Sequence, residues 1–175
     1  MKSILNSLKI AFTFLILVGC SNSDDSDSNV YGTIQLSGAD TAVVGSSLTV
    51  GNIDSDALDT TGTSSSVVLL DENTTFVNGE IESSDYSNAF IIVAAEFNAV
   101  DEADVEKSIS MTIVKNGVQM SYVCTSPATT SGGNIDCGTG FSVDKVEQEI
   151  IFSNTTVINV ENENVLTMNG VIQYN

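Results

Sequence analysis

The chain has 175 residues, of which 23 are acidic and 5 are basic, and its formal net charge is −18. A surface this acidic repels phosphate backbones and anionic membranes, so the composition argues against nucleic acid as a partner. Histidine and arginine are absent from the sequence, which removes the usual base of a nucleophilic triad and the usual cation of an oxyanion or phosphate site.

The N-terminal residues have the pattern of a secretory signal peptide. Lys2 and Lys9 precede the apolar run 10–18, as the charged and apolar regions of such a peptide do. A transmembrane helix requires roughly 20 apolar residues, so this run is too short to span a bilayer. We therefore expect the chain to be exported.

The motif Leu17-Val18-Gly19-Cys20 resembles the lipobox of bacterial lipoproteins. The resemblance implies a signal peptide over residues 1–19, cleavage before Cys20, and attachment of acyl chains such as palmitate to that cysteine. Two or three acyl chains anchor a protein stably, so the mature chain would remain on the membrane. The alternative is an ordinary signal peptide that carries a cysteine by chance.

Residues 20–29 are expected to form an acidic, flexible tether, because residues 21–29 carry no apolar side chain that could pack. Within it, Ser23-Asp24-Asp25 resembles the acidic export signal of surface-displayed lipoproteins of the Bacteroidota. That resemblance implies an outer-membrane location with the domain facing the cell surface. The alternative is a solvated linker that only separates the domain from the membrane.

Residues 30–175 are predicted to form one domain made of strands, because apolar and polar residues alternate over most of this region. Strands are predicted near 30–37 and 44–50, followed by a long loop over 51–66 that is rich in Gly, Asp, Ser and Thr. Further on, 67–70 is a short apolar strand. The run 89–95 is predicted to be a central strand buried on both faces, with a buried helix as the alternative.

A hairpin is the clearest local structure in the sequence. Alternating runs over 105–113 and 118–124 flank Asn116-Gly117, and Asn-Gly favours the type I′ turn because both central residues need positive φ. Beyond it, strands are predicted near 141–152, at 157–160 and at 165–174. No segment of the mature chain has helical periodicity, so the sequence predicts an antiparallel β-sandwich of about eight to ten strands.

The cysteines predict one disulfide. With Cys20 lipidated, Cys124 and Cys137 remain, and an exported protein meets an oxidising compartment. The alternative is a pair of metal thiolates, against which the absence of histidine argues.

Two acidic clusters are candidate calcium sites, because hard cations take several oxygen ligands. One cluster contains Asp54, Asp56 and Asp59, and the other contains Asp101 and Asp104. The first departs from an EF-hand loop, since Asp59 stands where that loop requires glycine. In a chain this acidic, either cluster can also be a solvated turn.

Two triplets, Asp40-Thr41-Ala42 and Asp59-Thr60-Thr61, resemble the acceptor of the Bacteroidota O-glycosylation system. The resemblance implies glycans on Thr41 and Thr60. The alternative is that both are loop threonines beside an Asx turn.

The sequence contains no recognisable catalytic motif, and no catalytic residue is assigned from it. We expect a lipid-anchored cell-envelope protein whose domain is a binding or structural module, with an envelope protein or a glycan as its partner. The alternative is a small carboxylate-dependent glycoside hydrolase, for which Glu96 is the acid of interest because it ends an apolar strand. Tryptophan is absent, so a sugar-binding face would have to use tyrosines, namely Tyr31, Tyr86, Tyr122 and Tyr174.

Overall fold

The computed structural model describes residues 30–55, 63–97, 104–129 and 133–174. Over these residues the chain forms twelve strands and one short helix. In chain order they are β1 (Gly32–Gly38), α1 (Thr41–Val44), β2 (Ser47–Val50), β3 (Asn52–Asp54), β4 (Thr63–Leu70), β5 (Thr74–Val77), β6 (Glu80–Ser83), β7 (Asn88–Phe97), β8 (Lys107–Lys115), β9 (Val118–Ser126), β10 (Phe141–Asp144), β11 (Glu149–Asn159) and β12 (Val165–Gln173).

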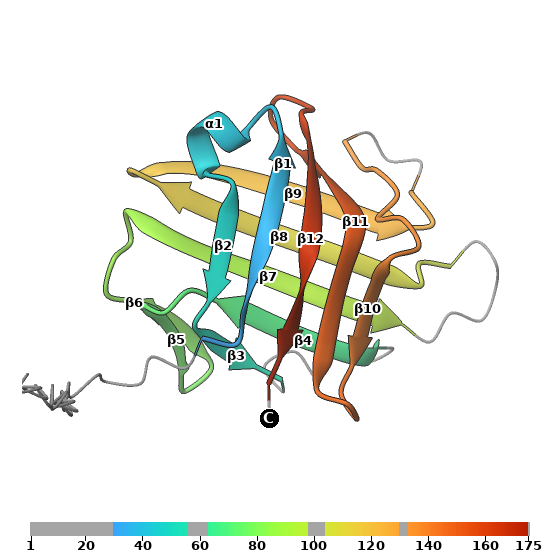
Figure 1. Cartoon of the computed structure of the whole chain (residues 1–175), viewed down its shortest axis with the longest axis horizontal. Coiled ribbons are helices and arrows are strands. Elements are labelled where there is room, and N and C mark those ends of the chain that lie inside the picture. The colour runs from blue at the N-terminus through green and yellow to red at the C-terminus, as the bar shows by residue number, and fades with distance from the viewer. Residues whose placement is uncertain (1–29, 56–62, 98–103, 130–132, 175) are drawn as a thin grey trace, which may run out of the picture.

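Ten of these strands belong to one sheet that folds over on itself. Its order is β2-β1-β12-β11-β9-β8-β7-β4-β3, with β10 also paired to β11, while β5 and β6 form a separate hairpin. The strands from β2 to β11 form one layer and those from β9 to β3 form the other, and the two sets cross steeply (Figure 1). The predicted antiparallel β-sandwich of about eight to ten strands is confirmed, with ten strands in the main sheet and its two layers joined into a nearly closed barrel.

The core lies between the two layers and follows from the alternation in the sequence. In β8, Ile109, Met111 and Ile113 are buried, whereas Ser110 between them is exposed. Successive side chains of a strand point to opposite faces, so each strand contributes one row to the interior. The largest fully buried side chains include Tyr122, Phe141, Phe152, Ile34, Leu69, Ile92, Ile150 and Leu166.

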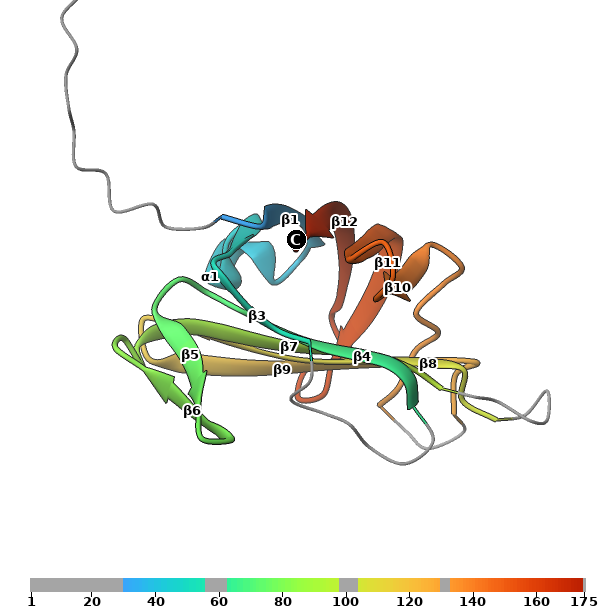
Figure 2. The same cartoon turned by 90° about the horizontal axis from the view of Figure 1, so that it is seen from below.

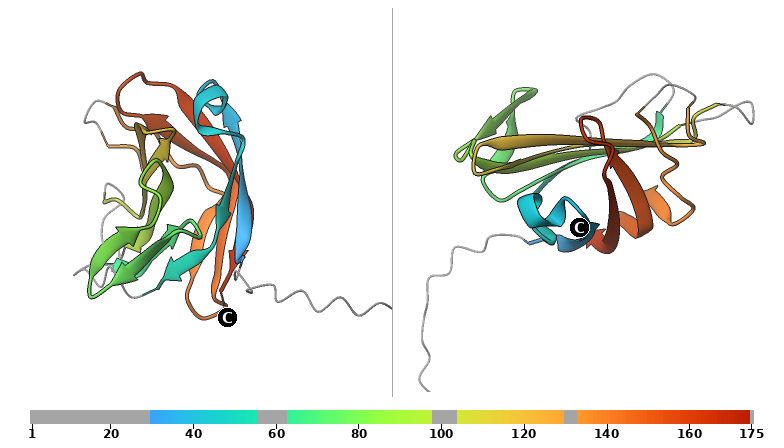
Figure 3. Two further views of the ribbon diagram at one scale, coloured as in Figure 1. Left: turned by 90° about the vertical axis from the view of Figure 1, so that its left-hand side faces the viewer. Right: turned by 90° about the horizontal axis from the view of Figure 1, so that it is seen from above.

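One seam between the layers is a bend in a single stretch of chain. β2 pairs with β1 in one layer, and β3 pairs with β4 in the other; Figure 3 shows this crossing from the side. Gly51 lies between β2 and β3, and its N–H donates to the carbonyl of Leu70 at 3.0 Å. A Cβ at Gly51 would lie 2.5 Å from the Cα of Glu72, so the close approach of the two backbones requires glycine.

The second seam has few main-chain pairs and a covalent bond. β11 pairs with β9 only at Ile158↔Val123 and Asn159↔Tyr122. Beside these pairs, the disulfide between Cys124 and Cys137 joins β9 to the segment before β10, and both cysteines are buried. The disulfide expected from the sequence is therefore present, and its sulfur atoms are not a pair of metal thiolates.

The helix α1 is absent from the sequence-based prediction. It is a single turn in which the N–H of Val44 donates to Asp40 and the N–H of Gly45 donates to Thr41. One turn is too short to show a helical period. In the part of the chain that is described, no helix is long and apolar enough to cross a membrane.

The expected loop over 51–66 was wrong at both ends. Residues Asn52–Asp54 form β3, and β4 begins at Thr63 rather than at Val67. The polar start of β4 is held in the sheet by its pairing with β7. Tertiary pairing here overrides a composition that is typical of loops.

The hairpin β5–β6 was missed, although its signal is in the sequence. Its turn is Asn78-Gly79, with φ of 53° and 84°, and the predicted turn Asn116-Gly117 has similar φ values of 52° and 78°. Both turns use the residues that tolerate positive φ. The hairpin projects from the face of the sheet that points away from β1 and β12 (Figure 2).

Two further predictions about strands need correction. Only one face of β7 is buried along its length, because Ile91 and Val93 on the other face are partly exposed, whereas Val67 to Leu70 in β4 are buried on both faces. The segments expected as separate strands near 149–152 and 157–160 form one strand, β11, with an irregularity between Phe152 and Thr155. A bulge of this kind interrupts the alternation without ending the strand.

Replacing Cys124 and Cys137 together with alanine should lower the free energy of unfolding, because the bond restrains the unfolded chain and closes the weaker seam. Their separation is 13 residues, for which the chain-entropy model gives about 3 kcal/mol. Urea denaturation followed by circular dichroism measures the change. The reduced wild-type chain is the control and should show the same loss; equal stability of all three forms would contradict the prediction.

Candidate functional site

Several residues singled out in the sequence lie outside the described residues. They are the lipidation site Cys20, the calcium candidates Asp56, Asp59 and Asp101, and the glycosylation candidate Thr60. Lipidation of Cys20, glycosylation of Thr60 and calcium binding at these three aspartates remain predictions.

The remaining calcium candidates are Asp54 in β3 and Asp104 shortly before β8. Among the residues that the structure describes, no group of three or more aspartate, glutamate, cysteine or histidine side chains is arranged to hold a metal ion. The remaining glycosylation candidate, Thr41, begins α1 and donates its hydroxyl to the carbonyl of Gly38 at 2.8 Å. Glycosylation there would have to displace this bond.

Glu96 holds the two layers together at the end of β7. Its Oε1 accepts from the N–H of Val143 at 3.1 Å and lies 3.6 Å from Nζ of Lys107. Lys107 in turn donates to the carbonyl of Phe141 at 2.6 Å and lies 5.9 Å from the centre of its ring. The pair thus satisfies one N–H and one C=O on the outer edge of β10.

This edge contact explains why an acid stands at the end of an apolar strand. An unpaired strand edge is a template for unwanted pairing, and charged side chains are one way to cover it. The side chains of Lys107 and Glu96 are 26% and 23% exposed, so the ion pair itself adds only modest stability. The role of Glu96 seen here is to cap β10.

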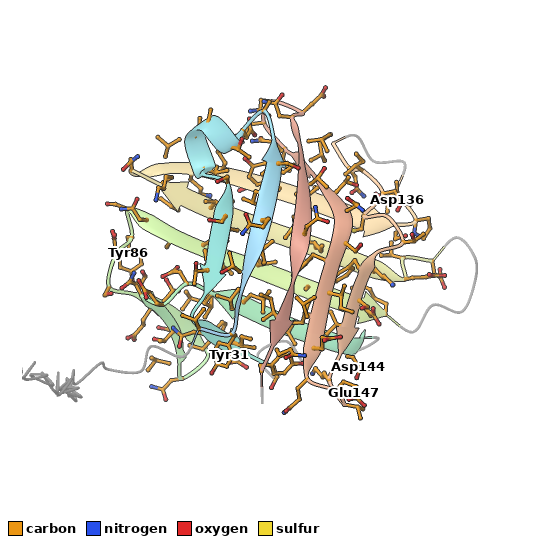
Figure 4. The ribbon with its side chains drawn as sticks, in the orientation of Figure 1. Tyr31, Tyr86, Asp136, Asp144 and Glu147 are labelled. Atoms are coloured by element: carbon orange, nitrogen blue, oxygen red, sulfur yellow. A yellow bond between two sulfur atoms is a disulfide. The ribbon has the colours of Figure 1, made fainter. Side chains whose placement is uncertain are left out.

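The tyrosines do not form a common sugar-binding face. Tyr122 is fully buried, so it cannot serve as a platform, contrary to the expectation. Tyr86 is 70% exposed and accepts a hydrogen bond from the N–H of Ser83. Tyr31 packs partly against the core and lies well away from Tyr86 (Figure 4).

Exposed acidic residues at the opposite side of the domain shape turns. Asp144 accepts from the N–H groups of Val146 and Glu147, and Asp136 accepts from the N–H of Gly138. Figure 4 places Asp136 apart from Asp144 and Glu147. Their described contacts are those of Asx turns rather than of a shared acidic centre.

A buried carboxylate, Asp40, accepts hydrogen bonds from four side chains, whereas the sequence suggested a role only for its neighbour Thr41. Asp40 lies between β1 and α1 and is 5% exposed. Its oxygens accept hydrogen bonds from Tyr122 at 2.9 Å, Asn159 at 2.9 Å, Asn164 at 2.6 Å and Asn162 at 3.3 Å. The donors come from β9, the end of β11 and the turn before β12, so the carboxylate ties both layers together.

The electrostatics of this cluster keep Asp40 ionised. Burial alone would raise the pKa of the carboxyl group, but the hydrogen bonds donated by the three asparagines and Tyr122 outweigh it and leave the pKa below its ordinary value. Burial and the adjacent carboxylate raise the pKa of Tyr122, so its hydroxyl stays a donor. Because its carboxylate oxygens are fully engaged by these donors and it is buried, Asp40 is a structural residue.

A cleft lies beside β2. It has a volume of about 340 Å³, near the lower end of the roughly 300–1,000 Å³ range of ligand pockets. It lies between β2, the end of α1, the turn after β4, and the adjoining ends of β7 and β8. The lining residues are Val44, Ser47, Leu48, Thr49, Asp71, Glu72, Asn73, Asn88, Ala89, Phe90, Ile113, Val114 and Lys115.

The cleft has an apolar floor and a polar margin. Leu48, Phe90 and Ile113 on the floor are buried, whereas Glu72 and Lys115 at the margin are exposed. A hydrophobic surface with a few polar groups around it is the usual composition of a ligand site. The cleft can therefore hold a ligand that has both apolar and polar groups.

Asp71 builds one wall of the cleft. Its carboxylate accepts from the N–H of Asn73 at 2.8 Å, the hydroxyl of Thr74 at 2.9 Å and the N–H of Phe90 at 2.9 Å. These bonds fix the turn after β4 against the start of β7. No sequence motif could have revealed the cleft, because its walls come from segments about 15 to 70 residues apart that meet only in the folded chain.

The chain matches no protein-family model, no curated protein and no solved structure. The function of the cleft therefore has to be inferred from its own residues.

Replacing Asp40 with asparagine should destabilise the fold by about 2 kcal/mol at neutral pH, because hydrogen bonds to a charged acceptor are stronger than those to an amide. The lowered pKa also has a pH signature. The contribution of Asp40 is fully present above the unfolded-state pKa of about 3.9 and is lost as pH falls through the lower folded-state value.

The stability difference between wild type and Asp40→Asn should thus shrink on acidification below that range, as measured by urea denaturation at a series of pH values. Glu161→Gln removes one exposed charge from the neighbouring turn and is the matched control, for which little change is expected. A difference that does not depend on pH would show that the carboxylate charge is unimportant.

Proposed function

We propose that this chain is a lipid-anchored protein of the bacterial outer membrane whose β-domain faces the cell surface and binds a partner there. The motif Leu17-Val18-Gly19-Cys20 supports the anchor, and Ser23-Asp24-Asp25 supports surface display. The domain begins directly after the tether, since β1 starts at Gly32. A short tether would hold the domain close to the membrane.

The observation that carries the binding role is the cleft beside β2. It combines buried apolar residues with exposed polar ones at one place. The carboxylates of Asp40 and Glu96, which lie elsewhere, are engaged in structural hydrogen bonds. A binding module requires a shaped surface but no reactive group. The cleft meets that requirement.

No observation favours the alternative of a carboxylate-dependent glycoside hydrolase. Such an enzyme needs two carboxyl groups about 5–10 Å apart on either side of the substrate. Glu96, the acid considered for this role, bonds to Val143 and lies beside Lys107 at the edge of β10, away from the residues that line the cleft. We therefore keep the binding module as the proposed function.

Replacing Cys20 with serine should abolish lipidation and release the chain from the membrane, because the acyl chains are added to the cysteine thiol. Metabolic labelling with a fatty-acid analogue, followed by membrane fractionation, measures both effects. Cys124→Ala with Cys137→Ala is the control, which removes the other two cysteines and should leave the labelling intact. Undiminished labelling of Cys20→Ser would refute the anchor.

Changing Asp24, Asp25 and Asp27 to asparagine should reduce surface display while leaving the anchor in place. The change removes the charges of the export signal and keeps the length and polarity of the tether. Digestion of intact cells with an added protease should then release less of the domain than in wild type. Equal digestion of both would identify the segment as a plain linker.

A further inference from the structure

We propose that the free edge of β2 binds an extended, positively charged segment of a partner protein, which adds to the sheet as a further strand. This inference rests on the proposed binding role of the domain and specifies its ligand. Addition of a strand to a sheet edge is a general mode of peptide recognition, in which main-chain hydrogen bonds give affinity and side-chain pockets give specificity.

The direction of the main-chain groups in β2 supports this mode. The carbonyl of Ser46 accepts from the N–H of Leu36 in β1, and Leu48 lies opposite Ile34. Successive residues of a strand turn their main-chain groups to opposite sides. Residues 46, 48 and 50 therefore face β1, whereas Ser47 and Thr49 face the other way.

Ser47 and Thr49 both line the cleft, and no described residue forms a main-chain hydrogen bond with either on that side. The next residue in this row is Gly51, whose N–H already bonds to Leu70 of β4. Along this edge of the chain, Gly51 forms a main-chain hydrogen bond to the other layer. The main-chain donors and acceptors of Ser47 and Thr49 have no such partner among the described residues. A peptide strand supplies matching groups at the same spacing.

The outer edge of β10, in contrast to that of β2, is covered by side chains. On β10, side chains of Glu96 and Lys107 cover the N–H of Val143 and the carbonyl of Phe141. No corresponding ion pair covers β2 among the described residues. A charged cover is the usual protection of an edge, so its absence beside an apolar cleft favours an edge used for binding.

The floor of the cleft gives the bound segment its side-chain pattern. Alternate side chains of a strand beside β2 would point toward the apolar floor that includes Phe90 and Ile113, and the others would point to solvent. An alternating apolar and polar segment fits this arrangement. A saccharide could contact the floor but would not match a row of main-chain N–H and C=O groups.

Charge selects among the possible occupants. The chain carries a net charge of −18, so a second copy pairing through its own β2 would meet strong repulsion, whereas a cationic segment would be attracted. The lining itself contains two acidic residues, Asp71 and Glu72, and one basic residue, Lys115, so its charge balance has the same sign as that of the whole chain. The apolar residues of the partner strand should therefore alternate with lysine or arginine.

The test uses a capped peptide of alternating valine and lysine and two matched peptides. In one, every residue is N-methylated, which removes the main-chain donors on both sides of the strand; in the other, glutamate replaces lysine. Fluorescence anisotropy should show binding of the first peptide and dissociation constants at least about tenfold higher for the other two, which is about 1.4 kcal/mol. Hydrogen exchange at the amides of Ser47 and Thr49 should slow when the first peptide is bound.

Two variants locate the binding. Thr49→Pro removes the outward N–H without removing a bond to β1, and proline is accepted at such edge positions; Thr49→Val, which keeps the N–H, is its control. Glu72→Lys reverses one exposed charge in the lining of the cleft and is independent of the backbone of β2, with Glu161→Lys, an exposed position outside the lining, as its control. We expect about a tenfold loss of affinity for the cationic peptide with Thr49→Pro and with Glu72→Lys, and none with the controls.

Several outcomes would overturn the proposal. They are equal binding of the N-methylated peptide, unchanged affinity of both Thr49→Pro and Glu72→Lys, or no binding of the cationic peptide. Slowed exchange at Ser47 and Thr49 would also count against it if sedimentation showed that the chain dimerises under the same conditions. Binding of a panel of oligosaccharides in the cleft, with no binding of the peptide, would overturn it as well. In that case release of Cys20→Ser from the membrane would still support the anchored module, so the two proposals fail separately.

Discussion

The constraint on which this structure depends is that a single ten-stranded sheet has to cover its own apolar face. If the sheet stayed flat and open, the Ile, Leu, Val, Phe and Met side chains on its apolar face would be exposed to water. Burial of each such side chain stabilises the fold by about 1.5–3 kcal/mol. When the sheet folds over, the inner faces of its two layers pack together and are removed from solvent, but two seams form where the layers meet. At one seam the backbone bends at Gly51, and at the other the disulfide and the short β11–β9 pairing join the layers.

The polar groups near these seams follow from the same constraint. Where main-chain pairing cannot continue from one layer to the other, side chains supply the missing bonds. Asp40 accepts from residues of both layers at one end of the domain, and the pair Glu96 and Lys107 caps β10 at another. A buried carboxylate is costly unless its oxygens are satisfied, which explains why Asp40 is surrounded by three asparagines and a tyrosine.

The cleft beside β2 lies where closure of the sheet stops. Gly51 bonds to β4, but Ser47 and Thr49 in the same row do not, and apolar side chains line the space in front of them. The proposed strand addition would complete this row from outside the chain. A lipid anchor and an acidic tether would place that edge at the cell surface, where a cationic segment of another protein can reach it.

Alternation of polar and apolar residues was enough to predict an antiparallel β-sandwich, and Asn116-Gly117 located the turn of the β8–β9 hairpin, because both signals depend only on neighbouring residues. Cysteine counting similarly paired Cys124 with Cys137. The extent of β4 and the continuity of β11 depend on pairing with other strands, so local composition did not predict them. The helix α1 is a single turn, which is too short to show a helical period. The tertiary structure alone decided that Asp40 and Glu96 are structural and that β2 borders a cleft, since the groups that contact Asp40 lie 82 to 124 residues away in the sequence.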